Sequence, residues 1–219
     1  YYSDLGDYSK AVGFGTQAME IRKEVLGESH PDYPTSLNNL AGYYSDLGDY
    51  TKAVEFGTQA LEIRKQVFGE SHPRYAITLN NLAGYYFDLG DYSRAVELGT
   101  QAMEIQKLVF SEFHPDYATS LANLANYNYL NGNYGEAYQL RLNSVLHTKD
   151  LVLSQFKGAT NRTRESFWNM NKFGFTLLPS FCLKAGDMDS SGEVYDNSAL
   201  FAKGLLLNAL SRCGCPLLP

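Results

Sequence analysis

Apolar side chains recur along the chain at the spacing of one helix face. After Pro31, the residues Leu37, Leu40, Ala41 and Tyr44 follow one another at intervals of three or four. This periodicity predicts an amphipathic helix that buries one stripe. The stretch "ESHPDY" is expected to start the helix, because proline is favoured in a first turn and Ser29 or His30 can cap it. The stretch "DLGDY" is expected to stop it.

A second helix is predicted after Gly48, which can adopt the left-handed conformation at a helix end. Asp49 or Thr51 can cap this helix. The side chains expected along its buried face are Ala53, Gly57, Ala60, either Ile63 or Arg64, and Val67. The stretch "FGESHP" then ends the helix and opens the next unit. The outcome is a pair of antiparallel helices.

This helix pair is repeated along the chain. Tyr1–Gly42, Tyr43–Gly84 and Tyr85–Asn126 align without a gap at a period of 42 residues, and a weaker fourth copy starts at Tyr127. The first two copies share 33 of 42 residues, and the second and third share 28. A single helix pair cannot bury its own apolar face, so stability must come from stacked neighbours. The repeats therefore predict an all-α solenoid.

A glycine recurs inside the second helix of each copy, at Gly15, Gly57 and Gly99. A glycine in the middle of a helix costs about 1 kcal/mol relative to alanine. The compensating gain expected here is a close approach of the first helix of the pair, with Tyr44 as the bulky partner of the small residue.

The run Leu37, Leu40, Ala41, Tyr44, Ala53 and Ala60, with "GDY" in the turn, resembles the tetratricopeptide repeat. Leucine stands where that repeat usually has its first tryptophan, and the usual closing proline is missing because the second helix is longer. The 42-residue form, with "LNNLA" and "ALEIRKQVFGESHP", is similar to the repeats of kinesin light chains and their bacterial relatives. The resemblance covers residues 1–154 and implies a right-handed superhelical solenoid of about three and a half copies, the first one truncated.

In that family the first helix of each pair lines a concave groove that binds partner proteins or peptides. The resemblance places these residues in the groove: Asp4, Asn38, Asn39, Gly42, Ser45, Asp46, Asn80, Asn81, Gly84, Phe87, Asp88, Asn123, Asn126 and Tyr129. An asparagine side chain offers one acceptor and two donors, which match an extended peptide backbone. We expect Asn39, Asn81 and Asn123 to contact a bound peptide. In the other interpretation the asparagines bond helix ends or neighbouring repeats.

The charge of the groove positions indicates the kind of ligand. Near the helix start they are Thr35, Ile77 and Thr119, and none of these would capture a terminal carboxylate. Near the helix end they form an acidic row of Asp4, Asp46 and Asp88. The sequence therefore predicts a neutral or basic extended segment as the partner. An aspartate before "LG" would also be explained as a cap of the turn.

The last part of the chain, residues 155–219, abandons the repeat and predicts a helical hairpin that caps the solenoid or links it to another domain. Within it, "RESFW" and "YDNSALFAKGLLLN" resemble the segment that joins tetratricopeptide arrays to a caspase-like CHAT domain in bacterial proteins. That resemblance implies a regulatory arm for a protease-like domain beyond residue 219. The alternative is a stand-alone scaffold or cargo adaptor of the kinesin-light-chain type.

Composition excludes several other functions. A net charge of −6 argues against nucleic-acid binding, and no apolar run approaches the roughly 20 residues that cross a bilayer. Three cysteines, Cys182, Cys213 and Cys215, are too few for a secreted disulfide framework and indicate the cytoplasm. No phosphate loop and no nucleophile with a positioned base is found, so we expect neither an enzyme nor a cofactor.

Two further expectations concern the ends and the histidines. His30, His72 and His114 lie one repeat apart, too far to converge on one metal ion, and are expected to be cap residues. The chain starts on Tyr1 in the middle of a repeat, which indicates a fragment. The apolar end face of such a stack predicts self-association.

Overall fold

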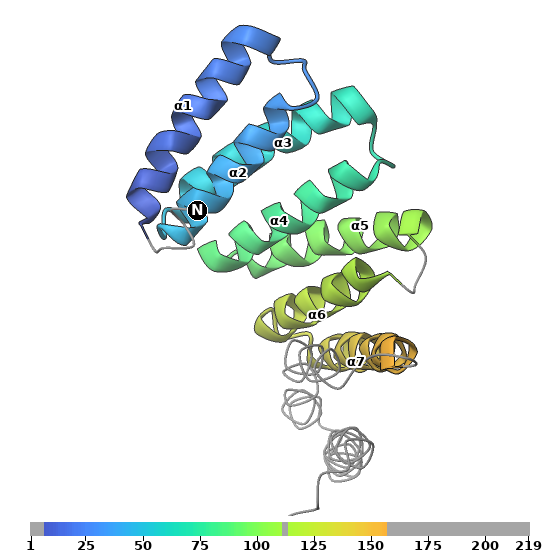
Figure 1. Ribbon diagram of the computed structural model, residues 1–219. Helices are drawn as coiled ribbons and strands as arrows, with labels where there is room; N and C mark the ends of the chain where they lie inside the picture. Colours follow the sequence, from blue (N-terminus) through green and yellow to red (C-terminus); the bar gives the residue numbers. More distant parts are fainter. Residues whose placement is uncertain (1–6, 111–113, 157–219) are drawn as a thin grey trace, which may run out of the picture. The chain divides into compact units, whose positions relative to one another are not determined.

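The computed structural model describes residues 7–110 and 114–156, and every regular element in these two ranges is an α-helix (Figure 1). The chain divides into two compact units at residues 111 and 112. The described helices of the first unit are α1 (Tyr8–Leu26), α2 (Tyr33–Asp46), α3 (Tyr50–Phe68), α4 (Pro73–Leu89) and α5 (Tyr92–Phe110). Those of the second unit are α6 (Pro115–Leu130) and α7 (Tyr134–Phe156).

An aspartate begins each second helix of the first unit. The carboxylates of Asp7, Asp49 and Asp91 accept hydrogen bonds from the backbone N–H groups three residues later, at 3.3, 3.2 and 3.1 Å. These bonds satisfy donors that a helix start leaves without an intrahelical partner. The aspartate of the "GDY" turn is thus the cap that the sequence indicated.

Histidines cap α4 and α6, as the sequence predicted, but the cap predicted for α2 at Ser29 or His30 is wrong, since the N-cap there is Asp32, which makes no side-chain cap bond. The Nδ1 atoms of His72 and His114 accept from backbone N–H groups at the starts of α4 and α6, at 3.1 and 3.2 Å. In both helices the proline that follows is the first residue. The start expected at Pro31 is wrong by two residues, because α2 begins at Tyr33. Pro34 has no N–H to donate to the carbonyl of residue 30, so a helix starting at Pro31 would lack its first bond.

Each helix of the first unit packs against the next one along the chain, and α2 also contacts α4. The first helices of neighbouring repeats therefore lie side by side and form one wall. Buried leucines and alanines, with a tyrosine, make up much of the core: Leu37, Leu40, Ala41, Ala53, Ala60, Tyr75, Leu79, Leu82 and Ala102. Of the two alternatives on α3, Arg64 is buried and Ile63 is half-buried.

The mid-helix glycines allow a close approach, but with a different partner from the one expected. A Cβ atom on Gly57 would lie 3.1 Å from Leu82 Cδ1 and 3.2 Å from Tyr85 Cδ2, both on α4. The contacting helix is the first helix of the following repeat. Tyr44 stacks instead on the ring of Phe56, with ring centroids 5.5 Å apart. The predicted pairing of Tyr44 with this glycine is therefore wrong. The tyrosine that packs on Gly57 is Tyr85, which lies in the following repeat and matches Tyr43 and not Tyr44.

The second unit contains a helix pair whose packing differs from that of the first. Ala137 and Leu140 of α7 are buried on the expected face. Arg141 stands where the earlier copies have Gly57 and Gly99, and it is buried as well. Its guanidinium donates to the side-chain oxygen of Asn126 at 2.6 Å and to a backbone carbonyl of α6 at 3.3 Å. A large side chain at the glycine position thus bonds the first helix of its own pair, whereas Gly57 contacts the first helix of the following repeat.

Three expectations concern residues outside the described part of the chain. They are the groove position Asp4, the three cysteines, and residues 157–219 of the predicted C-terminal hairpin with both CHAT-like motifs, whereas residues 155–156 belong to α7.

Candidate functional site

An open pocket lies on the wall that α2 and α4 form together. It has a volume of about 350 Å³ and is lined by Asn38, Asn39, Gly42, Tyr43, Asp46, Asn81 and Tyr85. Five of these residues are sequence-predicted groove positions. The two tyrosines are new. The pocket therefore brings together Asn38, Asn39, Gly42 and Asp46 of α2 with Asn81 and Tyr85 of α4 in the next repeat.

Tyr85 connects the floor of the pocket to the core. Its ring packs on Gly57 of α3, and its side chain is only 9% exposed. Its hydroxyl group lies 3.7 Å from the place where a Cβ of Gly42 would be. Burial and then the nearby carboxylates of Asp46 and Asp88 raise the pKa of Tyr85 from 10.0 to about 12. The hydroxyl therefore stays protonated at neutral pH and can both donate and accept a hydrogen bond.

The asparagines of neighbouring repeats are in contact with each other. The side-chain N–H of Asn81 donates to the side-chain oxygen of Asn38 at 3.2 Å, which links α4 to α2. This bond uses one of the two donors of Asn81 and part of the acceptor capacity of Asn38. Asn39 is exposed beside them, and Asn80 is half-buried. The pair is thus linked between repeats and still offers polar groups to the pocket.

The acidic end of the wall lies one turn further along both helices. The hydroxyl of Ser45 donates to Asp88 at 3.5 Å, which connects the ends of α2 and α4. Partial burial raises the pKa of the Asp88 carboxyl, and the Ser45 hydrogen bond opposes this shift. Asp46 lines the pocket itself. These contacts bring two of the three predicted acidic positions to one place.

Several other predicted groove residues lie outside the lining of this pocket. Phe87 turns toward Tyr92 at the start of α5, with ring centroids 5.6 Å apart, and Gly84 is half-buried outside the pocket lining. In the second unit, Asn126 is occupied by Arg141, and Tyr129 packs edge to face on Tyr134 with centroids 5.4 Å apart. Asn123 is half-buried on α6.

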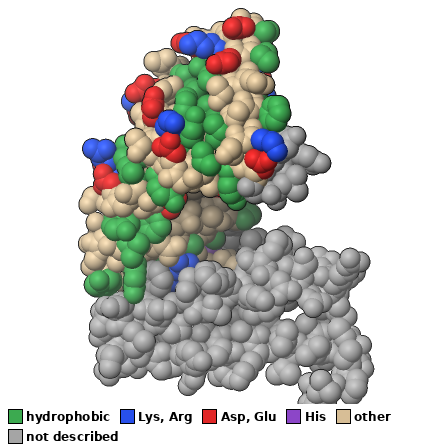
Figure 2. Space-filling view, turned by 90° about the vertical axis from the view of Figure 1, so that its left-hand side faces the viewer, with side chains coloured by type: hydrophobic (Ala, Val, Ile, Leu, Met, Phe, Trp, Pro, Cys, Tyr) green, Lys and Arg blue, Asp and Glu red, His purple; other side chains and the backbone are tan. Residues whose placement is uncertain are grey.

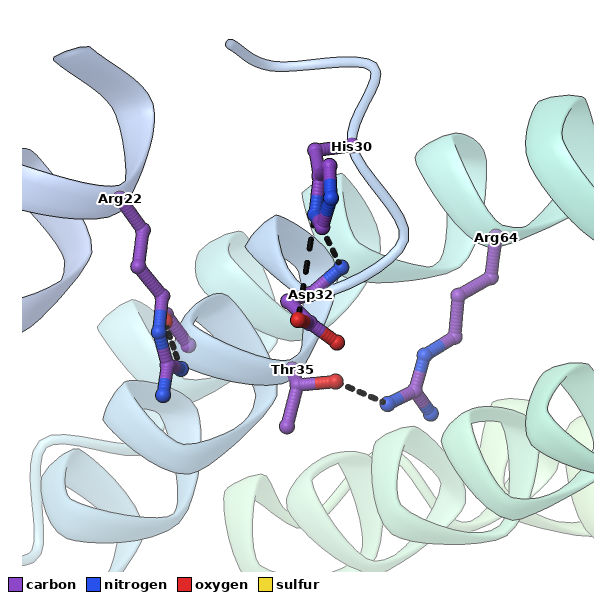
Figure 3. A network of polar contacts seen from close by, with 6 residues as sticks. Arg22, His30, Asp32, Thr35 and Arg64 are labelled. Atoms are coloured by element: carbon purple, nitrogen blue, oxygen red, sulfur yellow. Dashed lines mark hydrogen bonds and ion pairs between the residues drawn. The ribbon is translucent and has the colours of Figure 1, made fainter. Parts of the chain in front are cut away.

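A buried arginine lies behind the start of α2, where the sequence indicated only neutral side chains. Arg64 of α3 is 5% exposed and donates to the carbonyl oxygen of Arg74 at 2.8 Å and to the hydroxyl of Thr78. Its other terminal nitrogen reaches the hydroxyl of Thr35 at 3.5 Å (Figure 3). Burial, and then the charge of Arg74, lowers the pKa of Arg64. One side chain thus ties α3 to the first helices of two repeats.

This arginine has a counterpart in the first repeat. Arg22 of α1 donates to the hydroxyl of Ser36 on α2 at 2.5 Å (Figure 3). Arg22 and Arg64 lie one period apart, and so do their hydroxyl partners. The sequence left the Arg64 position open, since an arginine on a buried face can also point to solvent.

The described residues offer neither a metal centre nor a membrane span. Within the two described ranges no group of three His, Cys, Asp or Glu side chains is arranged to hold a metal ion. None of the described helices combines the length and the apolar character that crossing a bilayer requires. The Nδ1 atom of His30 accepts a hydrogen bond from the backbone N–H of Asp32 at 3.2 Å (Figure 3).

The profile of the tetratricopeptide repeat family matches residues 1–66, 46–108 and 76–140. The chain belongs to the tetratricopeptide repeat family. This confirms the predicted all-α repeat superhelix. No curated protein is similar enough in sequence to match.

Solved structures extend the comparison. A Podosopora anserina protein described as a kinesin light chain with nearly identical TPR-like repeats is 26% identical, with a TM-score of 0.71 over 91% of this chain and 89% of that one. BtubC (BKLC) from P. vanneervenii is 21% identical, with a TM-score of 0.76 over 100% of this chain and 79% of that one.

A Rap protein complexed with Competence and Sporulation Factor is 15% identical, with a TM-score of 0.58 over 96% of this chain and 61% of that one. BtubC and this Rap protein show the tetratricopeptide fold alone. The family and these likenesses together support a protein-interaction module.

Proposed function

We propose that this tetratricopeptide protein binds an extended, neutral to basic peptide segment of a partner protein in the groove of α2 and α4. The observation that carries the proposal is the open pocket, which is lined by three asparagines, a glycine and a carboxylate. Asparagine side chains can hydrogen-bond the alternating N–H and C=O groups of an extended backbone. Gly42 leaves room for that backbone to approach. The Rap structure with its bound factor supports a ligand-carrying use of this fold.

The first test removes the backbone contacts. We expect the double variant Asn39→Ala and Asn81→Ala to weaken binding of a peptide by about tenfold, because it removes two hydrogen-bonding side chains from the groove. The peptide would be selected on the wild-type chain from a displayed library of random sequences, and its affinity measured by calorimetry. Asn143→Ala is the matched control, since Asn143 is an exposed asparagine on α7. An unchanged affinity in the double variant would show that the asparagines serve only to link the repeats.

The regulatory context is a second part of the proposal. We infer that the solenoid is the sensor arm of a bacterial CHAT-type protein, in which partner binding switches a protease-like domain. The support is that residues 164–168 and 195–208 resemble the segment that joins tetratricopeptide arrays to a CHAT domain. In this proposal the repeats themselves have no catalytic role. The alternative is a stand-alone adaptor. The coding sequence after residue 219 distinguishes them, because a protease arm needs a following domain with a spaced histidine and cysteine.

Self-association through α1 is a further expectation. The helix exposes Ile21 (59%) and Val25 (73%), whereas the equivalent residues of α3 are half-buried. Figure 2 shows hydrophobic side chains gathered in a strip on this side of the first unit, flanked by charged ones. We expect the average mass in sedimentation equilibrium to rise above 24.5 kDa with concentration, and Ile21→Glu to abolish the rise. Leu108→Glu, at an exposed leucine of α5, is the control. A wild-type chain that stays monomeric would contradict the expectation.

A further inference from the structure

Asp46 and Asp88 are the two described aspartates without a basic partner. Neither forms an ion pair with a Lys, Arg or His side chain of the described residues. The other aspartates whose side chains are described each have a basic nitrogen at 2.6–3.9 Å, and these are Asp7, Asp32, Asp49, Asp91 and Asp116. Two carboxylates at the acidic end of the groove are therefore left for an external cation.

A buried polar group points to the same place. Tyr85 is more than nine-tenths buried, yet its hydroxyl reaches the pocket wall beside Gly42. Within the described part of the chain the hydroxyl forms no hydrogen bond. Among the described residues this oxygen is not one of the fully enclosed unbonded atoms, so it is open to the pocket and can bond a group that enters there. Both carboxylates act on it: after burial, Asp46 and Asp88 are the further causes of the raised pKa of Tyr85.

We propose that the pocket lined by Asp46 and Tyr85, with Asp88 near the Tyr85 hydroxyl, holds the ammonium or guanidinium group of a lysine or arginine side chain in the bound peptide. This proposal rests on the proposed function and adds the position and chemistry of one specific contact. Asp46 supplies the ion pair from the pocket lining. The Tyr85 oxygen accepts one N–H of the cation, and Asp88 adds negative charge from the next repeat.

The shape of the site suits a long basic side chain. Gly42 presents no side chain toward the Tyr85 hydroxyl, and the pocket is open to solvent on one side. The apolar stem of a lysine or arginine can cross the wall beside Tyr43 while its charged end reaches the carboxylates. A carboxylate of a ligand would be repelled at the same place. The groove therefore discriminates by charge at this end.

The test uses the full chain and two defined probes. Random twelve-residue peptides are displayed and selected on the wild-type chain, and their sequences are compared with those selected on Asp46→Asn with Asp88→Asn, on Tyr85→Phe, and on Asp32→Asn. Asp32→Asn is the control for general charge, since it removes one carboxylate from an exposed position outside the pocket. The second probe is n-butylammonium, titrated while backbone amide shifts are recorded by nuclear magnetic resonance.

We expect wild-type selection to enrich lysine or arginine at one fixed peptide position. The double aspartate variant should lose that enrichment and bind the selected peptide about tenfold more weakly, with a reduced dependence on salt. Asp32→Asn should change the affinity less than twofold. n-Butylammonium should shift the amides of Gly42 and Asp46 in the wild type and not in the double variant.

The outcomes separate the two proposals. Peptides that bind without an enriched basic position would overturn the cation pocket and leave the proposed function standing. A failure of all peptides to bind would contradict the proposed function, and n-butylammonium would then decide the cation pocket alone. Equal losses of peptide affinity in the double variant and in Asp32→Asn would also overturn the pocket, because the affinity would then depend on the net charge of the chain and not on these two carboxylates.

Discussion

Gly57→Val is expected to lower the free energy of unfolding by about 2–3 kcal/mol. The reason is the contact of α3 with α4. Even a Cβ atom at this position would lie 3.1 Å from Leu82 and 3.2 Å from the Tyr85 ring, and valine adds two methyl groups. Tyr85 would have to leave its place on the glycine, and the pocket floor would move with it. Urea unfolding followed by circular dichroism measures the stability, and calorimetry with a groove peptide measures the pocket.

Gly13→Val is the matched control for this change. Gly13 also lies inside a helix, but a Cβ atom there would have no neighbour within 4 Å. Valine is a slightly better helix former than glycine, so this variant should gain a few tenths of a kcal/mol. If both variants show the same stability, the close approach of α3 and α4 is not what retains the mid-helix glycine.

The helices themselves could be predicted from the sequence because their signals are local. Asp49 and His72 cap helices with side chains only a few residues from the groups they bond. Gly90 takes a left-handed conformation (φ 89°) directly after α4, as a glycine at a helix end is expected to do. The late start of α2 was missed because two prolines compete there, and only Pro34 removes a bond that the longer helix would need.

The pocket could be predicted only in part because its floor is made by contacts between repeats. Asn38, Asn39 and Asp46 follow from the family geometry of one helix. Tyr43 and Tyr85 do not, since an aromatic residue at helical spacing indicates a core position. Tyr85 is in fact a core residue along its ring and a pocket residue at its hydroxyl.

The sequence left one buried arginine open, Arg64 as the alternative to Ile63, and did not predict the other, Arg141. Arg64 and Arg141 stand on helix faces where a charged residue is usually assigned to solvent. Each is nevertheless buried and bonded to a neighbouring first helix, Arg64 through Thr78 and Arg141 through Asn126. Asn126 was expected in the groove because it matches a groove position of the repeat. The replacement of glycine by Arg141 explains why its oxygen is occupied instead.

The stability of the wild-type chain is expected to fall between pH 10 and pH 12 because of Tyr85. Burial, with Asp46 and Asp88, raises the pKa of Tyr85 to about 12 in the folded chain, above its ordinary value of 10.0. The unfolded chain therefore loses this proton first as the pH rises. The contribution of the protonated hydroxyl is fully present below pH 10 and is lost as the pH passes 12. A difference of two pKa units corresponds to about 2–3 kcal/mol.

Tyr85→Phe isolates this contribution, because it keeps the ring on Gly57 and removes the group that titrates. Urea unfolding at a series of pH values should show a shallower decline for this variant, with the difference from wild type growing between pH 10 and pH 12. Other groups that titrate in this range, including the lysines and Tyr75, are common to both chains and cancel in the difference. Asp46→Asn should leave the onset of the decline near pH 10, which the unfolded chain sets, but end it at a lower pH and make it smaller, since one of the charges that raise the pKa of Tyr85 in the folded chain is gone. Identical slopes for wild type and Tyr85→Phe would mean that the hydroxyl is fully hydrated, and the pocket floor would then not be the one described.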